Sequence, residues 1–457
     1  MHGINLAGKD ALFRKAGISM ANQIPNQRKP QNNRTDGTVF RPLPDNAVPS
    51  HGGHGKPQAV KSKPPVKKPL IPRTDPIVQP DMIIKRGNID RPLLVILIIL
   101  LCFGSVMVFS ASYSSALSEK GNSYYYILRH LGFIAFGSVI MMGEIVVFKN
   151  GYQWIRKITP FIYLAGLAML AFVLVYGVAL GVARRWIYIG SFSIQPSEIM
   201  KFALILTLAA YYAKYQTRIL SPKFLYSSLW GDLYPFLLVA VPCGLIALEN
   251  HLSGTIIVFV IGMTVIFAAG SRKIWFLVAA VLAIALFIVA VTCIPYVQKR
   301  FDAFLHPENY DSNKETWQTD QGLIAVGSGG WLGVGLGNSR QKHQFVSQPQ
   351  NDFIFAIVCE ELGFVGALCV ILLFILFIIR GFTIALRAPD TFSTLTAIGI
   401  TTQLGLQAIL NMMVVTDIIP NTGISLPFFS YGGSSLLIQM AEAGMLLSIS
   451  RFSYDKE

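Results

Sequence analysis

The sequence contains few charged residues for its length. Only 14% of the 457 residues are Asp, Glu, Lys or Arg, whereas 53% are apolar, and the mean hydropathy is +0.52. Soluble domains carry roughly 25% charged residues. The shortage of charge therefore excludes an ordinary soluble domain and indicates an integral membrane protein.

Several common catalytic signatures are also missing. We find no Walker phosphate-binding loop, no HExxH zinc motif and no Ser-His-Asp arrangement. The cysteines lie in or at the edges of apolar runs, without the spacing of a metal site or disulfide framework, and are interpreted as small core residues. They are Cys102, Cys243, Cys293, Cys359 and Cys369. Any chemistry must then run on carboxylates, arginines and a substrate that carries its own leaving group.

Residues 1–90 differ in composition from the rest of the chain. They are rich in Pro, Gly, Asn and Gln and carry most of the formal net charge of +14. Such a segment cannot bury enough apolar surface to fold alone, so we predict a disordered basic cytoplasmic tail before a transmembrane domain at 91–453. The basic run 61–68 is either a solvated tether or a contact with anionic lipid head groups. Because no aromatic residues interleave its charges, we expect no nucleic-acid partner.

Ten apolar stretches are long enough to cross a bilayer, which predicts an all-α polytopic membrane protein with about ten transmembrane helices. They cover 92–111, 125–147, 158–178, 195–213, 233–248, 253–269, 274–294, 353–379, 393–416 and 432–450. One large outer loop, 295–351, separates the seventh stretch from the eighth. The short fifth and sixth stretches flank residues 249–251, which indicates a tight hairpin or a broken pair.

Lysine and arginine alternate between the loops as the positive-inside rule requires. The even-numbered connections carry them, for example at Lys149, Arg218 and Arg380, and most odd-numbered connections are poor in them. We therefore expect the even-numbered connections and both chain termini in the cytoplasm.

The third connection is an exception, because it places Arg184, Arg185 and Trp186 outside. Two cations there suggest an anionic ligand, since the planar guanidinium suits phosphate. A salt bridge to an outer acid, with the tryptophan as an interface anchor, explains the same residues equally well.

The most informative segment is VSQPQNDFIFAIVCEELG, residues 346–363. It places Asp352 where a polar loop enters an apolar helix, with Glu360 and Glu361 about two turns further on. Ionisable groups at or inside a bilayer are costly, so each is a functional-site candidate. Asp352 also has the position of a helix N-cap, and spacing alone slightly favours capping over catalysis.

Two further polar groups interrupt the apolar pattern. Glu198 and Lys201, at the start of the fourth stretch, are three residues apart and share a helical face, so they can partly neutralise each other. Such a pair is either structural or part of a proton or ligand site. Before the last stretch, PFFSYGGSS offers hydroxyls and backbone amides at a helix N-terminus, where an anion could bind. The candidates there are Ser430, Gly432 and Gly433.

The outer loop contains GSGGWLGVGLGNS at 327–339. Its GxG spacings lack the preceding strand and following helix of a dinucleotide site, and the loop faces away from cytosolic nucleotides. We therefore reject nucleotide binding and expect the glycines to allow tight turns and close backbone approach.

Six stretches together resemble the SEDS family of shape, elongation, division and sporulation proteins. They follow the family's order over nearly the whole membrane region and read ARRWIYIGSFSIQPSEIMK, LENHLSGTIIVF, KRFDAFLHPENYD, WQTDQGLIAVGSGGWLGVGLGNSRQK, NDFIFAIVCEELGFVG and LPFFSYGGSS. GLGNSRQK is more similar to the FtsW-like division branch than to the RodA-like elongation branch. LENHLSGT also fits the division branch and its sporulation relatives.

The resemblance implies a peptidoglycan glycosyltransferase in the bacterial cytoplasmic membrane. Members polymerise lipid II, an undecaprenyl-pyrophosphate-linked disaccharide peptide, at the outer face of that membrane. It implies a class B penicillin-binding transpeptidase and other divisome membrane proteins as partners, at the division septum.

The resemblance also implies roles for individual residues. The family's essential outer-loop Asp matches Asp352, and its Glu and Lys of the fourth span match Glu198 and Lys201. Its Arg-Arg-Trp motif matches Arg184, Arg185 and Trp186.

The chain departs from the family's pattern at two places. The family's Leu-Pro-Glu reads Val346-Ser347-Gln348 here, and its Gln-x-x-Gln-Ser reads QTDQG from Gln318. Loss of the Glu weakens any role for a second carboxylate but leaves Asp352 in place.

The implied reaction converts an α-linked donor into a β-linked product. Such a single inversion needs one general base and no covalent intermediate, and Asp352 is the expected base. We expect its place at a helix N-terminus to keep it ionised and to limit its basicity. Arg184, Arg185 and Arg129 are the expected stabilisers of the departing pyrophosphate. A divalent cation, Mg or Mn, could share that task, and no other cofactor is expected.

Two other functions stay open from the sequence. A lipid II flippase would suit ten spans with intramembrane Glu198 and Lys201. A non-catalytic divisome scaffold would need Asp352 for folding alone. The absence of a clear inverted repeat, and polar groups that gather on the outer side, favour the enzyme.

Overall fold

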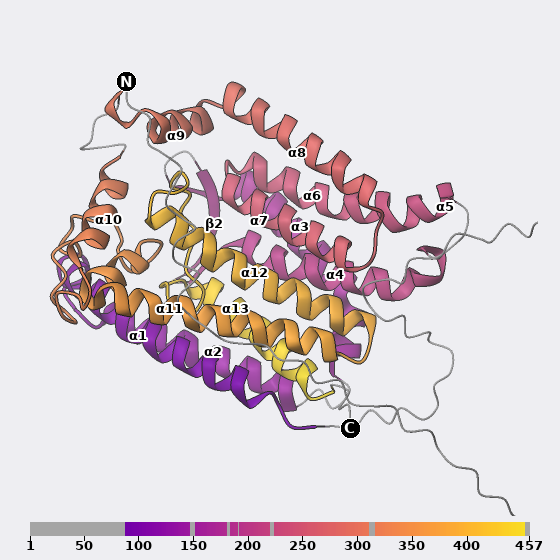
Figure 1. Cartoon of the computed structure of the whole chain (residues 1–457), viewed down its shortest axis with the longest axis horizontal. Helices are drawn as coiled ribbons and strands as arrows, with labels where there is room; N and C mark the ends of the chain where they lie inside the picture. Colours follow the sequence, from indigo (N-terminus) through magenta and orange to yellow (C-terminus); the bar gives the residue numbers. More distant parts are fainter. Residues whose placement is uncertain are drawn as a thin grey trace, which may run out of the picture. The chain divides into compact units, whose positions relative to one another are not determined.

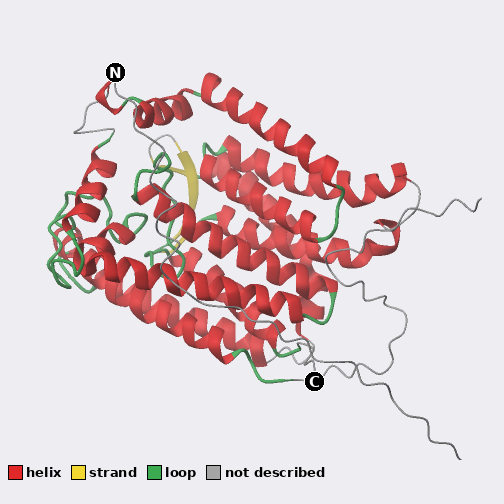
Figure 2. Cartoon of the chain, in the orientation of Figure 1, coloured by secondary structure: helices red, strands yellow, loops and turns green. Residues whose placement is uncertain are grey.

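Helices account for nearly all of the structure, a computed structural model shown in Figure 1 and Figure 2. It describes residues 87–146, 151–180, 183–190, 192–219, 224–309 and 316–452. These residues belong to one compact unit of the chain, Val66–Glu457. The predicted basic tail lies outside the described residues except for 87–90.

Each predicted apolar stretch falls on a helix. In chain order the helices are α1 (Arg91–Lys120), α2 (Tyr125–Val146), α3 (Gly151–Tyr176), α4 (Pro196–Ile219), α5 (Phe224–Ser228), the π-helix η1 (Leu229–Leu233), α6 (Tyr234–Leu248), α7 (Leu252–Ala268), α8 (Lys273–Cys293), α9 (Pro295–Leu305), the 3-10 helix η2 (Pro307–Asn309), α10 (Trp317–Ser328), α11 (Ile354–Arg387), α12 (Thr391–Val415) and α13 (Gly433–Ser450). The large loop predicted at 295–351 therefore contains α9 and α10.

The predicted all-α membrane fold is confirmed, although fewer helices than ten qualify as spans by themselves. Seven helices of the described chain are long and apolar enough to cross a bilayer: α1, α2, α3, α5 with α6, α8, α11 and α12. The other three predicted spans are α4, α7 and α13. Helix α7 has 17 residues, and α4 and α13 carry buried charged side chains. Because α13 is enclosed by α2 and α12, it needs no apolar face towards lipid.

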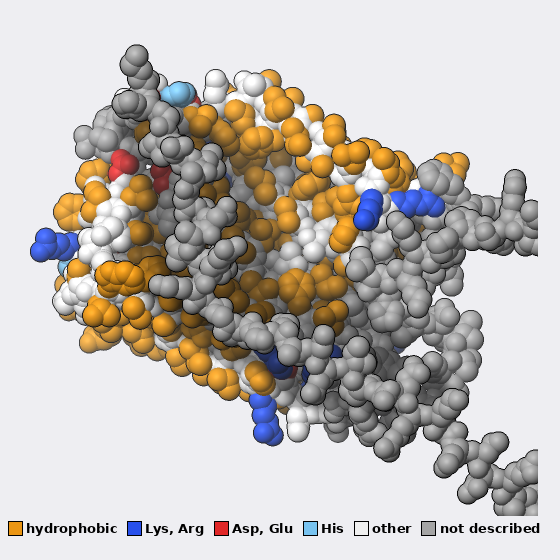
Figure 3. All heavy atoms as spheres, viewed as in Figure 1, with side chains coloured by type: hydrophobic (Ala, Val, Ile, Leu, Met, Phe, Trp, Pro, Cys, Tyr) orange, Lys and Arg blue, Asp and Glu red, His pale blue; other side chains and the backbone are white. Residues whose placement is uncertain are grey.

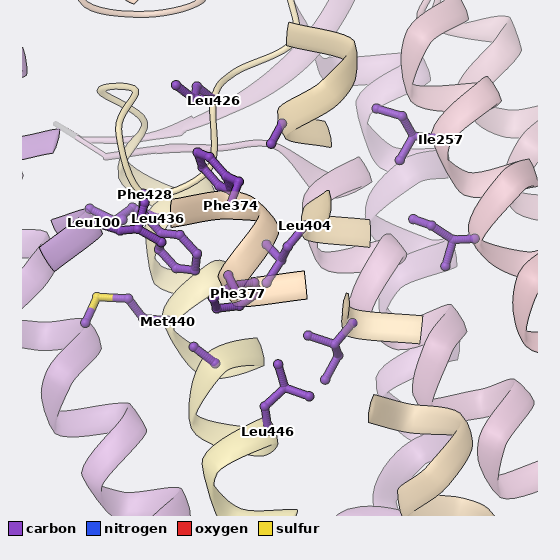
Figure 4. Packing of buried hydrophobic residues seen from close by; sticks show 14 of the residues in the cluster. Leu100, Ile257, Phe374, Phe377, Leu404, Leu426, Phe428, Leu436, Met440 and Leu446 are labelled. Carbon is purple, nitrogen blue, oxygen red and sulfur yellow. The ribbon is translucent and has the colours of Figure 1, made fainter. Parts of the chain in front are cut away.

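Hydrophobic side chains cover the middle of the described surface in Figure 3, and lysines and arginines lie towards its edges. This distribution is the one expected of a protein that crosses a bilayer. Inside, α11, α12 and α13 pack around a common core (Figure 4), in which the ring centroid of Phe377 lies 5.8 Å from that of Phe428 and Met440 faces Gly137 of α2. Phe377 and Met440 are fully buried.

A small antiparallel sheet, which the all-α prediction did not include, fills the connection between α3 and α4. It consists of β1 (Val178–Leu180), β2 (Ala183–Ile189) and β3 (Phe192–Ile194), in the order β1-β2-β3. Trp186 pairs with Val178, and Ile187 pairs with Ile194. The sheet fixes the backbone of the Arg-Arg-Trp motif.

Helix α11 is interrupted near its start at Gly363, whose backbone has φ 66° and ψ −162°. The groups freed by the break bond to the glycine-rich segment of the outer loop. The amides of Val334 and Gly335 donate to the carbonyls of Glu360 and Glu361, both at 3.0 Å. The amides of residues 364 and 365 donate to the carbonyls of residues 330 and 331 at 2.9 and 3.2 Å. The expected role of these glycines, close backbone approach, is therefore confirmed.

The carboxylates of Glu360 and Glu361 accept further hydrogen bonds from the same loop. Glu361 is fully buried and accepts from Lys342 Nζ at 2.9 Å and from Ser110 Oγ of α1 at 2.6 Å. Glu360 accepts from the Arg340 amide at 2.8 Å and from the Ser339 hydroxyl. Their sequence position made them functional-site candidates, but their contacts fasten the outer loop to α1 and α11.

Replacement of Gly363 by alanine should unfold this region. The backbone conformation is one that only glycine adopts readily, which costs about 1–3 kcal/mol for other residues. A Cβ would also lie 2.4 Å from the Gly333 nitrogen. We expect Gly363→Ala to lower the thermal transition of the detergent-purified protein strongly, as measured by fluorescence-detected size exclusion after heating.

Gly132→Ala is the matched control, because Gly132 lies in α2 with nothing within 4 Å of its added Cβ. Alanine there should leave the transition unchanged or raise it slightly. Equal transitions for both variants would contradict the role assigned to the break.

Candidate active site

A cavity of about 190 Å³ lies among the ends of several helices on the side of the large loop. Its wall comes from Trp186 of β2, the start of α4, the turn before α7, residues 348–352, Gln407 of α12, residues 423–425 and the start of α13. Asp352, Glu198 and Lys201 all line it. The structure therefore brings together three of the residues singled out in the sequence.

Asp352 lies in the turn that enters α11 and is half-buried. The N-cap of α11 is Phe353, without a side-chain cap, so the capping interpretation of Asp352 is wrong. Asn411, a fully buried residue of α12, donates to the carbonyls of Asp352 and Ile424, both at 2.7 Å. A Cβ on Gly423 would lie 3.6 Å from Asp352 Oδ2, so this carboxylate faces the segment that follows α12.

The Asp352 carboxylate is more basic than its place at a helix start suggested. Burial raises its pKa to about 6, against the opposing effects of backbone amide bonds and the charge of Arg300. Desolvation therefore outweighs the local dipoles. A carboxyl with this pKa is mostly ionised at neutral pH yet accepts a proton more readily than an exposed Asp.

Arg300 of α9 is a cation of the site that the sequence analysis did not single out. Its Nη1 donates to the carbonyl of Asn421 at 2.6 Å, and its guanidinium lies 4.7 Å from the ring centroid of Tyr296. Its charge acts on Asp352. It lies inside KRFDAFLHPENYD, one of the stretches that resemble the family, but the resemblance implied no role for this arginine.

Glu198 and Lys201 form the predicted pair, with Nζ 2.8 Å from Oε1. Lys201 also donates to Gln407 Oε1 at 3.0 Å, and the Gln407 amide nitrogen donates to Ser425. Both charged residues are buried. This chain of bonds links α4 to α12 and to the segment 423–425 beside Asp352.

The arginines expected to bind an anion take different positions. Arg185 donates to the carbonyl of Asn250 in the α6–α7 turn and bonds to Tyr296, and it does not line the cavity. Arg184 lies in β2, but its side chain is outside the described residues.

Arg129 reaches the cavity through one intervening residue. Its guanidinium lies 4.7 Å from the ring centroid of Tyr125 and bonds to the Tyr431 hydroxyl. Tyr431 lines the cavity, and its amide donates to Gln350 at 2.8 Å.

Of the three candidate residues before α13, one lines the cavity and two make contacts that support the fold. Gly432 lines the cavity. The Ser430 hydroxyl accepts from the Leu426 amide at 2.7 Å and so closes a turn. A Cβ on Gly433 would lie 2.6 Å from the Phe133 ring, so this glycine allows α13 to approach α2.

A metal site was left open by the sequence. The described residues contain no group of three or more His, Cys, Asp or Glu that could hold a metal ion. A divalent cation beside Asp352 would take most of its ligands from substrate phosphates and water, as Mg²⁺ commonly does.

The fold and the cavity define a class: a polytopic membrane protein whose half-buried carboxylate faces a cavity on the side of its large loop. Within that class the chain belongs to the cell cycle protein family of FtsW, RodA and SpoVE, whose sequence profile matches residues 91–455. The resemblance drawn from the sequence is thereby confirmed.

Relatives are similar over most of their length. The chain is 37% identical over 374 residues to the stage V sporulation protein E of Bacillus subtilis (strain 168), covering 81% of this chain and 100% of that protein. It is 37% identical over 367 residues to the probable peptidoglycan glycosyltransferase FtsW of Trichlorobacter lovleyi, covering 79% and 93%.

Solved structures have the same fold. A chain from "Structural coordination of polymerization and crosslinking by a peptidoglycan synthase complex" matches with a TM-score of 0.64 and 26% identity, covering 80% of this chain and 99% of that one. The rod shape determining protein RodA of Thermus thermophilus matches with a TM-score of 0.58 and 25% identity, covering 80% and 98%.

Removal of the Asn411 side chain should impair the site without touching the carboxylate. Asn411→Ala leaves two buried carbonyls without their donor, which costs about 1–3 kcal/mol each, and frees the Asp352 backbone. We expect kcat for glycan polymerisation to fall about tenfold or more.

Asn338→Ala is the control, since Asn338 makes one loop bond, to the Val334 carbonyl at 3.2 Å. Its kcat should match the wild type. A normal kcat for Asn411→Ala in a folded, monodisperse protein would show that Asp352 is positioned by other contacts.

Proposed function

We propose that the cavity at Asp352 is the glycosyl-transfer site of this membrane enzyme. The chain is a peptidoglycan glycosyltransferase that acts in cell-wall synthesis, as its family membership and its FtsW relatives establish. The observation that carries the assignment of the site is the Asp352 carboxylate, raised in pKa to about 6, on the wall of a cavity with Lys201.

In the proposed reaction two lipid II molecules meet at this cavity. The acceptor's 4-hydroxyl oxygen attacks the anomeric carbon of the donor sugar, and the bond from that carbon to the undecaprenyl pyrophosphate breaks. The hydroxyl proton passes to Asp352 as the new glycosidic bond forms. One displacement inverts the configuration, so no covalent enzyme intermediate is needed.

The leaving pyrophosphate gains negative charge, which cations near the site can stabilise. Lys201 lines the cavity, Arg300 is not among its lining residues but its charge acts on Asp352, and Arg129 bonds to Tyr431 of the cavity wall. Lys201 is already paired with Glu198, so Arg300 is the better candidate. Arg185 supports the site through its bond to the Asn250 carbonyl. For Arg184 the proposed role, contact with the substrate, rests on its position in the sequence.

The location of the cavity favours an enzyme over a flippase. Transporter sites lie near the bilayer midplane, whereas this cavity is built from the starts of α4, α7, α11 and α13 and the segment after α12. These ends gather on the side of the large loop. With both termini placed in the cytoplasm from the loop charges, that side is the outer face of the bacterial cytoplasmic membrane.

A class B penicillin-binding transpeptidase is the proposed partner, together with other divisome membrane proteins. Support comes from the structural match to a chain of a peptidoglycan synthase complex. We place the enzyme at the division septum on the FtsW-like stretch GLGNSRQK, although a sporulation protein is an equally similar relative.

Loss of the Asp352 carboxylate should nearly abolish polymerisation. Removal of a general base typically costs on the order of 10² to 10⁴ in rate, so Asp352→Ala and Asp352→Asn should lose at least about a hundredfold in lipid II polymerisation. The measurement uses purified protein in complex with its transpeptidase, with the amount of complex checked by pull-down.

Glu308→Gln is the matched control, because Glu308 is an outer-loop acid with a largely exposed side chain. It should polymerise like the wild type. Wild-type amounts of polymer from Asp352→Ala would remove Asp352 as the base.

Acid should inactivate the enzyme through Asp352. Because burial raises the pKa of Asp352 to about 6, the ionised base is nearly complete above pH 7 and is lost as the pH falls through 6. The pH profile of kcat/KM reports this group in the free enzyme, so we expect a tenfold decline for each pH unit below about 5.5. A profile that stays flat to pH 5 would contradict the assignment.

A further inference from the structure

The turn between α6 and α7 carries a histidine that the mechanism above does not use. His251 precedes α7, lines the same cavity as Asp352 and is only 7% exposed. Its Nδ1 is buried without a hydrogen-bond partner in the described part of the chain. An imidazole has two nitrogens, so a ring on the wall of a cavity can still bond a ligand through the other one, Nε2.

The surrounding backbone gives the His251 ring one orientation. Arg185 holds the carbonyl of Asn250, and Thr255 donates to the His251 carbonyl from its amide at 3.0 Å. A Cβ on Gly254 would lie 2.6 Å from Nδ1 and 2.7 Å from Cε1, so this edge of the ring lies directly against Gly254. Nε2 is then the ring nitrogen left to the cavity.

The charges around His251 keep it neutral. Burial, together with Arg185 of β2, Lys201 of α4 and Arg300 of α9, holds the pKa of His251 well below its usual value. The acids that line the cavity are Asp352 and Glu198, and Glu198 is paired with Lys201. A neutral imidazole can donate or accept a single bond at Nε2, but it brings no positive charge to a pyrophosphate.

We infer that His251 Nε2 hydrogen-bonds an uncharged oxygen of the sugar, a hydroxyl or an acetamido carbonyl, and thereby positions the glycan beside Asp352. The inference rests on the proposed function, because it takes the occupant of the cavity to be a lipid-linked sugar. Near Asp352, cationic side chains would then bind the pyrophosphate, and neutral side chains would bind the sugar. Orientation of this kind contributes to rate by holding the reacting atoms in place.

The test compares His251→Ala and His251→Gln with the wild type, as full-length chains in complex with the transpeptidase. One readout is kcat and KM for lipid II polymerisation over pH 5–8. The other is the Kd of fluorescent lipid II in an Asp352→Asn background, where turnover does not interfere. Thermal unfolding of each variant establishes that it is folded.

We expect His251→Ala to raise both KM and Kd about tenfold, the effect of one lost hydrogen bond to the substrate. His251→Gln should recover most of this loss, because its amide is neutral and offers both a donor and an acceptor. The pH profile should keep its position, because Asp352 sets it. His343→Ala is the matched control: His343 lies on the exposed part of the outer loop, with Nδ1 2.9 Å from Ser114 Oγ, and should bind and polymerise normally.

Three results would overturn the inference. Unchanged KM and Kd for His251→Ala, with normal wild-type polymerisation, would leave the proposed function standing and remove His251 from it. A His251→Gln variant as defective as His251→Ala, with an altered pH profile, would assign an imidazolium role. A lowered unfolding temperature with unchanged Kd would make the residue structural. If the wild type bound lipid II without polymerising it, the proposed function would fail and the Kd values would still decide on His251.

Discussion

The break in α11 is the constraint on which the outer half of the molecule depends. Backbone groups that lose their helical partners within a membrane protein cost several kcal/mol each when unsatisfied. Glycine adopts the backbone conformation at position 363 without the cost of about 1–3 kcal/mol that other residues incur, and four bonds with the glycine-rich loop satisfy the groups that the break frees. The loop is therefore fixed to α11, and the buried carboxylates of Glu360 and Glu361 hold its next residues. Because these residues precede Asp352 in the chain, their fixed position helps to position Asp352.

The chemistry of the site follows from two opposing effects on one carboxylate. Burial disfavours the charged form of Asp352, while Arg300 and nearby amides favour it, and burial prevails. The resulting pKa of about 6 suits a base that must be ionised at neutral pH and yet accept a proton. Glu198, on the same wall, is neutralised by Lys201. The structure thus gives two carboxylates of one cavity different surroundings.

The sequence was sufficient for features that depend on local pattern or on a family motif. The positions of the ten apolar helices, the interruption at 249–251, the Glu198–Lys201 pair and the family all came from it. It could not supply the contacts that join distant segments. The tie from Arg185 to the α6–α7 turn, the clasp of Asn411 on Asp352 and the bond from Ser110 to Glu361 link residues far apart in the chain, and periodicity carries no signal for such pairs. The N-cap interpretation of Asp352 failed for a similar reason, since the Asp352 carbonyl accepts from Asn411, a residue of α12 far along the chain.

Binding and turnover of lipid II, measured on one preparation of the Asp352→Asn protein in complex with its transpeptidase, test the central claim most directly. The account predicts a Kd within about twofold of the wild type and a turnover reduced at least about a hundredfold, as expected when a general base is removed from an intact site. Turnover close to the wild type, or a loss of binding as large as the loss of turnover, would contradict Asp352 as the base of this cavity.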